Sequence, residues 1–180
     1  MDEIDTFFAQ YPGFAYSRDQ PIHAEFYRMC DDFGWRKDEP ERERAWKLFR
    51  IAVVQAFNST VGSNANDLAS WQQICRCLRI SPMPKGLRNA QQAVVQTHVN
   101  LVDLLQSIRA GSPVEAFSTL EDLRAYTIEN GRYFPKEEAY EGGLLRFLLR
   151  EIHNEYKGKQ RPARERRNGR SRNDPASSNT

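Results

Sequence analysis

Apolar residues recur three and four positions apart along much of the chain before residue 157, the spacing that places side chains on one face of an α-helix. The opening segment shows this pattern, and a Pro-Gly pair at positions 12 and 13 ends it. Nowhere do polar and apolar residues alternate with the period of two that marks a half-buried strand. We therefore predict an all-α fold.

Proline, glycine and capping residues divide the pattern into about six to seven helices, which we expect to pack as one compact bundle. Asp38 and Glu41 have the spacing of a capping box at the start of one helix. Gly142 and Gly143 are expected to separate a turn from the closing helix, because each glycine inside a helix costs about 1 kcal/mol relative to alanine. A close crossing of two helices at this pair is the alternative.

The segment from Leu87 to Arg109 is predicted to be the longest helix and the centre of the fold. Around His98, apolar side chains occupy an arc of roughly 220°, whereas Asn100 and Asp103 lie about 140 to 160° away. One helix cannot bring these three side chains together as a catalytic or metal site. We expect His98 to face the core in its neutral form, because burial disfavours charge, with a hydrogen-bond partner from another helix.

Three cysteines, Cys30, Cys75 and Cys77, are an odd and sparse set for a disulfide-linked secreted protein, so we expect reduced thiols. Two residues apart in a helix, Cys75 and Cys77 point about 200° apart and cannot chelate a metal jointly. We place Cys75 in the core and expect Cys77 to be partly exposed. No motif for a cofactor or a metal is present, and neither is predicted.

Nine aromatic side chains (Phe, Tyr and Trp) occur within residues 6–35, and most are expected to fill the core, Phe33 among them. Tyr11, Phe14 and Tyr16 lie in a predicted loop, where helical burial does not explain them. They either hold the first helix against the core or form an exposed docking patch. A platform for nucleic-acid bases would want basic neighbours, and Arg18 is the one close in sequence.

The charge is distributed unevenly along the chain. From Lys157 onward there are eight basic and two acidic residues, a balance of +6, which leaves −4 for residues 1–156 because the whole chain carries +2. The basic residues are Lys157, Lys159, Arg161, Arg164, Arg166, Arg167, Arg170 and Arg172. Residues 157–180 contain nothing larger than proline or alanine to bury, so we predict a helical domain at 1–156 and a disordered basic tail at 157–180.

The acidic N-terminal segment resembles no secretory signal, and no stretch approaches the roughly 20 apolar residues that span a bilayer. These features predict a nuclear or cytoplasmic protein without membrane contact. The basic tail fits a nuclear-import signal, or an arm that contacts nucleic acid with little sequence preference and strong dependence on salt. A solubilising terminus is the alternative.

Four strings, EFYRMCDDFGW, DLASWQQICRCLRI, THVNLVDLL and FPKEEAYEGGLLRFLLREI, resemble a group of small helical proteins from filamentous fungi. The similarity covers about residues 3 to 153. It implies a fungal intracellular protein. No activity comes with the resemblance, so no catalytic or binding residue is transferred from it.

The sequence thus favours a non-enzymatic helical module that binds a protein partner and uses its basic tail for nuclear targeting or nucleic-acid contact. One alternative is a small enzyme in which His98 meets a carboxylate or cysteine from elsewhere, with Asp103, Tyr126, Cys30 or Cys75 as the available groups. A deep polar pocket at His98 would favour the enzyme, and a filled core the binding module. Another alternative is a protein tethered to RNA or DNA by the tail itself.

Overall fold

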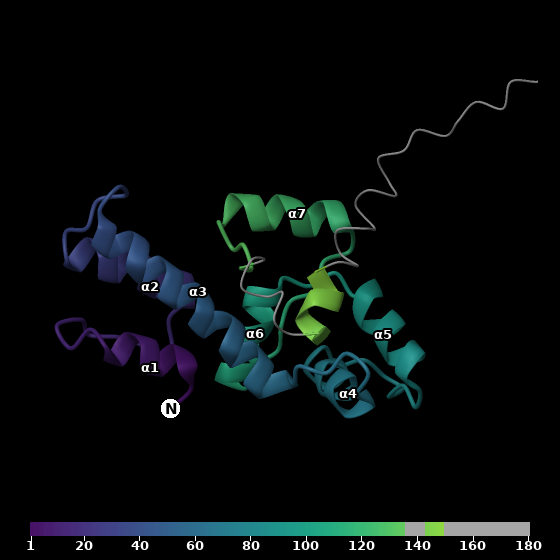
Figure 1. Cartoon of the computed structure of the whole chain (residues 1–180). Helices are drawn as coiled ribbons and strands as arrows, with labels where there is room; N and C mark the ends of the chain where they lie inside the picture. The colour runs from purple at the N-terminus through teal and green to yellow at the C-terminus, as the bar shows by residue number, and fades with distance from the viewer. Residues whose placement is uncertain (136–142, 150–180) are drawn as a thin grey trace, which may run out of the picture.

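The computed structural model of the chain describes residues 1–135 and 143–149, and all regular structure within them is helical (Figure 1). An isolated antiparallel bridge between His98 and Phe117 is the nearest approach to a strand in this part of the chain. The all-α prediction is confirmed. The helices are α1 (Glu3–Ala9), α2 (Ile22–Asp32), α3 (Pro40–Val61), α4 (Leu68–Cys77), α5 (Leu87–Gln96), α6 (Leu101–Ala110), α7 (Leu120–Glu129) and a short helix at 143–149.

Helix α3 organises the fold. Its 22 residues make it about 33 Å long, and it packs against α1, α2, α4 and α6. Figure 1 shows α1 and α2 beside one end of α3, with α4, α5 and the helix at 143–149 gathered beyond its other end. The prediction that residues 87–109 form the longest and central helix is therefore wrong.

That expected long helix is broken into α5 and α6 by an extended linker from Thr97 to Asn100. The Asn100 side chain caps α6, because its Oδ1 accepts hydrogen bonds from the backbone N–H groups of Val102 (2.9 Å) and Asp103 (3.3 Å). The backbone N–H of Phe117 donates to the carbonyl of His98 at 2.7 Å. A continuous apolar pattern conceals this break, since linker and helices alike face the core.

Aromatic rings fill the space between α1, α2 and α3. The ring of Phe49 on α3 lies 5.5 Å from that of Phe7, 6.1 Å from Phe8 and 4.9 Å from Phe26, measured between centroids. All four side chains are buried, as the helical spacing predicts. Full burial of each such ring contributes about 1.5–3 kcal/mol to stability.

The other half of the core surrounds Trp71 on α4, which is fully buried. Its indole Nε1 donates to the carbonyl of Ala65 at 2.8 Å, and its ring meets Phe147 edge-on at 5.3 Å. Cys75 is buried one turn further along α4, and Cys77 is partly exposed, so both cysteine placements are confirmed. The buried apolar residues of both halves form one continuous cluster.

The start of α3 differs from the sequence expectation. The predicted capping box at Asp38 is absent, since α3 begins at Pro40 with Glu39 in the capping position and no side-chain cap. Proline at the first helical position fixes a helical φ and lacks the N–H that a cap would satisfy. The closing helix begins at Gly143, whereas the expected turn around residues 136–140 lies outside the described residues.

Helix α2 ends in a Schellman turn at Gly34. The N–H of Trp35 donates to the carbonyl of Cys30 (2.8 Å), and the N–H of Gly34 donates to that of Asp31 (3.0 Å). This turn requires the left-handed backbone of Gly34, whose φ is +67°. It places Phe33 and Trp35 close together at the end of the helix.

None of the helices in the described residues combines the length and apolar character required to cross a bilayer.

Candidate interaction surface

Three aromatic side chains lie together where α2 ends and the chain turns toward α3. We call Tyr11, Phe33 and Trp35 the aromatic surface. The rings of Phe33 and Trp35 are stacked, with centroids 5.1 Å apart and planes 23° from parallel. Tyr11 lies 6.2 Å from Phe33 and 5.8 Å from Trp35. Phe33 is 38% exposed, whereas Tyr11 and Trp35 are half-buried.

The prediction that Phe33 faces the core is thus wrong. Phe33 is the C-cap residue of α2, where the backbone leaves the helix and the inward face of the helix no longer directs the side chain. The Schellman turn then brings Trp35 back over it. Two large rings are consequently held face to face at the surface.

Arg42, in the first turns of α3, connects this surface to a second exposed ring. Its Nη1 donates to the carbonyl of Trp35 at 3.1 Å, and its guanidinium lies 5.9 Å from the ring centroid of Tyr27. Tyr27 is 43% exposed and stacks on Trp46 with centroids 6.1 Å apart. The α2–α3 face therefore carries a band of partly exposed aromatic rings.

Of the three loop aromatics, two hold the first helix in place. Tyr16 stacks on Phe8 with centroids 4.3 Å apart, and its hydroxyl donates to Asp5 Oδ1 at 3.3 Å. Phe14 is buried beneath the guanidinium of Arg28, 4.2 Å from the ring centroid. Burial raises the pKa of Tyr16 above its ordinary value. Tyr11 alone of the three contributes to the aromatic surface.

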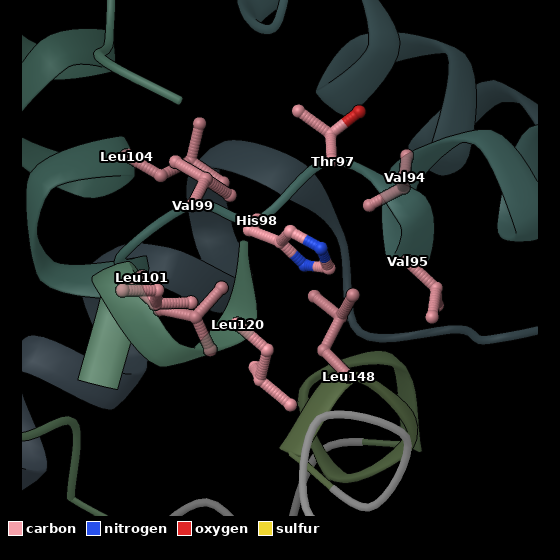
Figure 2. Close-up of a pocket in the computed structure, with 10 residues that line it drawn as sticks. Val94, Val95, Thr97, His98, Val99, Leu101, Leu104, Leu120 and Leu148 are labelled. Atoms are coloured by element: carbon pink, nitrogen blue, oxygen red, sulfur yellow. The ribbon is translucent and has the colours of Figure 1, made fainter. Parts of the chain in front are cut away.

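His98 lies in the linker between α5 and α6, not on a helix, and is half-buried (Figure 2). It lines a cavity of about 10 Å³, which has room for about one water at most. The other lining residues are Val94, Val95, Thr97, Val99, Leu101, Leu104, Leu120, Leu123 and Leu148. Among the described residues no carboxylate and no cysteine lines the cavity, and no hydrogen bond to the imidazole is formed, so the predicted partner from another helix is not found there.

The groups considered for an enzyme site are engaged elsewhere. Asp103 pairs with Arg132, whose guanidinium lies 5.5 Å from the ring centroid of Tyr126. Cys75 Sγ lies 4.0 Å from the carbonyl of Ala90. Cys30 is buried on α2. The described residues do not assemble these groups around His98.

His23 is a buried titratable residue that the sequence pattern did not single out. Its ring meets Phe49 at 5.3 Å and Trp46 at 6.0 Å, in both cases edge-on. Burial, reinforced by the positive charge of Arg132, lowers its pKa from 6.5 to about 4. Nδ1 is buried without a hydrogen-bond partner among the described residues. Its position three residues before Phe26, next to the buried face of α2, is the signal in the sequence that could have indicated its burial.

A hollow of about 320 Å³ lies between the C-terminal ends of α4 and α6. Arg76, Cys77 and Arg79 line one side of it, and Ser107, Ile108 and the turn at 111–113 line the other. Burial raises the pKa of the Cys77 thiol, which disfavours the reactive thiolate. No group of three or more potential metal ligands occurs in the described part of the chain.

No family model, curated protein or solved structure matches this chain. The resemblance to the fungal group remains a prediction. The basic tail residues, from Lys157 to Arg172, lie outside the described residues, so their proposed contacts with nucleic acid or an import receptor also remain predictions.

Proposed function

We propose that this chain is a non-enzymatic helical protein-interaction module, and that its basic segment at 157–180 directs it to the nucleus or to nucleic acid. The partly exposed stack of Phe33 and Trp35 is the observation that carries the first part. Aromatic rings are enriched in protein interfaces and depleted on the remaining surface. A rigid pair fixed by a helix-terminal turn provides contact area with little conformational entropy to lose on binding.

The uneven charge supports the second part. The +6 balance after residue 156 concentrates eight basic side chains in sixteen positions, whereas the rest of the chain carries −4. Such a segment attracts phosphates and the acidic grooves of import receptors without needing a defined fold. The apolar lining of the His98 cavity and its small volume also favour a binding module over the enzyme alternative.

A set of four neutralising substitutions tests the role of the segment in the full-length protein: Arg164→Gln, Arg166→Gln, Arg167→Gln and Arg170→Gln. We expect nuclear accumulation of a fluorescent fusion to fall and retention on single-stranded nucleic acid to weaken. Each lost phosphate contact reduces the slope of log affinity against log salt by about 0.7. Measuring retention at several salt concentrations between about 50 and 200 mM gives that slope.

The matched control removes four exposed basic charges from the helical body, away from the α2–α3 face: Arg76→Gln, Arg79→Gln, Lys85→Gln and Arg88→Gln. This variant has the same net charge as the first and should retain the original localisation and salt slope. Equal loss in both variants would indicate a general charge effect. If neutralising the segment changes neither localisation nor retention, the proposed role of the segment is wrong.

A further inference from the structure

The aromatic surface is surrounded by charged side chains. Residues 31–44 contain six carboxylates and four basic groups, a local balance of −2. The carboxylates belong to Asp31, Asp32, Asp38, Glu39, Glu41 and Glu43, and the basic groups to Arg36, Lys37, Arg42 and Arg44. Arg42 is already engaged by the Trp35 carbonyl and the Tyr27 ring. All the carboxylates except that of the half-buried Glu39 belong to exposed residues.

We propose that the aromatic surface binds the arginine-rich segment of the same chain, residues 157–172, and so masks that segment from nucleic acid and import receptors. This inference names the ligand chemistry of the proposed interaction surface, and it rests on the proposed function for the role of the segment. Binding of nucleic acid or of a receptor then competes with an intramolecular contact.

The chemistry of the two parts is complementary. Six of the eight basic residues in the segment are arginines. A guanidinium stacks on aromatic faces and forms paired hydrogen bonds with carboxylates, and both kinds of group lie within residues 31–44. Phe33 and Trp35 offer the rings, and Asp31 and Asp32 directly precede them. The α2–α3 turn therefore supplies both halves of an arginine-binding surface.

Chain length permits this contact for the distal residues of the segment. The helix at 143–149 meets the C-terminal end of α3, where the N–H of Leu144 donates to the carbonyl of Ser63 at 2.9 Å, and the aromatic surface lies at the other end of α3, about 33 Å along that helix. Lys157 is eight residues beyond Leu149, the last described residue, and Arg172 is 23 residues beyond it. At about 3.3–3.6 Å per extended residue, these lengths reach roughly 26 Å and roughly 80 Å. A tethered segment also acts at an effective concentration in the millimolar range, so individually weak contacts are occupied.

Zero-length carbodiimide cross-linking of the full-length protein tests the proposal, because it joins lysine amines to carboxylates only where they are in contact. Mass spectrometry on an Arg166→Lys, Arg170→Lys background, used for every cross-linking measurement, should find these two lysines joined predominantly to carboxylates of residues 31–43 at low salt. The yield should fall at least threefold, an order-of-magnitude expectation, when 1 M salt shortens the screening length to about 3 Å. Cross-links concentrated on the α7 carboxylates Glu121, Asp122 and Glu129, or spread evenly, would overturn the proposal.

Ring removal tests the aromatic contribution. The Phe33→Ala, Trp35→Ala variant leaves every carboxylate in place, and its cross-linking yield should fall at least about threefold. Tyr133→Ala is the matched control, since Tyr133 is 57% exposed and lies after α7. Its yield should equal that of the unaltered protein. Mixed samples of isotopically light and heavy chains must give links within one chain, and links between copies would overturn masking in cis.

Nucleic-acid retention separates this inference from the proposed function. Removing the two rings should release the segment and raise retention about threefold. A second variant keeps the rings and neutralises four carboxylates, and its retention on nucleic acid should also rise. Its substitutions are Asp31→Asn, Asp32→Asn, Asp38→Asn and Glu41→Gln. Unchanged or reduced retention in both variants overturns the masking proposal, and reduced retention in the ring variant alone would assign the rings to base stacking. The proposed function fails separately, if neutralising the segment leaves retention unchanged.

Discussion

Arg109, in the last turn of α6, donates two hydrogen bonds to Asp2, the residue that caps α1. Arg109 Nε lies 2.7 Å from Asp2 Oδ2, and Nη2 lies 3.3 Å from Oδ1. Nη2 also lies 2.8 Å from Asp5 Oδ1 and 2.9 Å from the Tyr16 hydroxyl. Burial by itself raises the pKa of Asp2, but the hydrogen bond and positive charge of Arg109 outweigh it and lower the pKa below its ordinary value.

Replacing Arg109 should destabilise the protein strongly. The Arg109 side chain is 4% exposed, so Arg109→Met leaves Asp2 and Asp5 without their buried partner. We expect the free energy of unfolding to fall by about 3 kcal/mol, measured by urea denaturation at neutral pH. The difference from the unaltered protein should shrink as pH falls through the lowered pKa of Asp2, because protonation removes the charge that Arg109 stabilises.

Arg18→Gln is the matched control for this substitution. Arg18 pairs with the same two carboxylates, at 3.3 and 2.7 Å, but its side chain is 50% exposed. Solvent screening limits such a pair to about 1 kcal/mol or less. Equal effects of the two substitutions would contradict the structural role assigned to Arg109.

His23 should make stability depend on pH in a window above that of the carboxylates. Its pKa is about 4 in the folded protein and 6.5 in the unfolded chain, so the unfolded chain binds the proton first as pH falls. The contribution of neutral His23 to the free energy of unfolding is fully present above about pH 6.5. It declines as the pH falls toward about 4, by about 3 kcal/mol at most. His23→Phe should remove this slope, because phenylalanine keeps the ring contacts with Trp46 and Phe49 and has no proton to gain.

Urea denaturation of the unaltered protein and of His23→Phe, in steps of about half a pH unit, gives the free energy of unfolding of each. The difference between the two curves is the contribution of His23. NMR titration of the imidazole ring provides an independent measurement of its pKa. A folded-state value near 6.5 would contradict the burial of His23 without a partner at Nδ1.

Asn100 should stabilise the fold because its side chain joins the start of α6, helix α7 and the segment after α7. Besides capping α6, its Nδ2 donates to Thr127 Oγ1 and to the carbonyl of Arg132, both at 3.0 Å. Asn100→Ala should lower the free energy of unfolding by about 2–3 kcal/mol, through the lost cap and the buried groups left unpaired. Asn100→Asp keeps an acceptor for the cap but lacks the donor, so it should have a smaller effect.

Asn130→Ala is the comparison for Asn100, since Asn130 is exposed and bonds only the carbonyl of Tyr126, at 2.9 Å, among the described residues. Its substitution should change stability by about 0.5 kcal/mol or less. Hydrogen exchange should also show that Asn100→Ala loosens α7 more than α1. Uniform loosening of both helices would argue against a local link.

Replacing Arg79 with glycine should stabilise the protein. It follows the end of α4 with a φ of +55°, the left-handed backbone that Gly34 adopts after α2. Its N–H donates to the carbonyl of Arg76 (3.0 Å), and the N–H of Ile80 donates to that of Cys75 (2.9 Å), so the turn is the same. Arg79→Gly relieves the left-handed strain and should raise thermal and urea stability by about 0.5–1 kcal/mol.

Arg76→Gly, three residues earlier in the chain, is the comparison and should destabilise the protein. Arg76 lies within α4, where glycine lowers stability by about 1 kcal/mol. The two substitutions remove the same charge, so their difference reports backbone conformation. Destabilisation by both would contradict the strain assigned to Arg79.

Helical periodicity was enough to predict most of the buried residues. Phe7, Phe26, Phe49 and Trp71 follow three- and four-residue spacing, and each is buried where that spacing places it. Such a pattern succeeds because burial of one helix face is the main source of stability for helices of this length. Cys75 was placed in the core for the same reason.

The aromatic surface and the buried ionic group depended on contacts between distant segments. Asp2 and Arg109 are 107 positions apart, and nothing local indicates their pairing. Phe33 follows the helical spacing of α2, yet the turn at Gly34 directs it outward. The sequence left two alternatives for Tyr11, Phe14 and Tyr16, a staple for the first helix or an exposed docking patch. Packing buried Phe14, tied Tyr16 to Arg109 and left Tyr11 beside Trp35.

The amino-acid sequence by itself determined the helical class, the apolar faces and the separation of charge between residues 1–156 and 157–180. These properties are carried by neighbouring residues or by composition. Only the tertiary structure decided which helix is central, that the chain breaks at His98, and which rings reach the surface. Those outcomes depend on competition among several helices for the same buried volume, and a linear pattern does not record which of them occupies it.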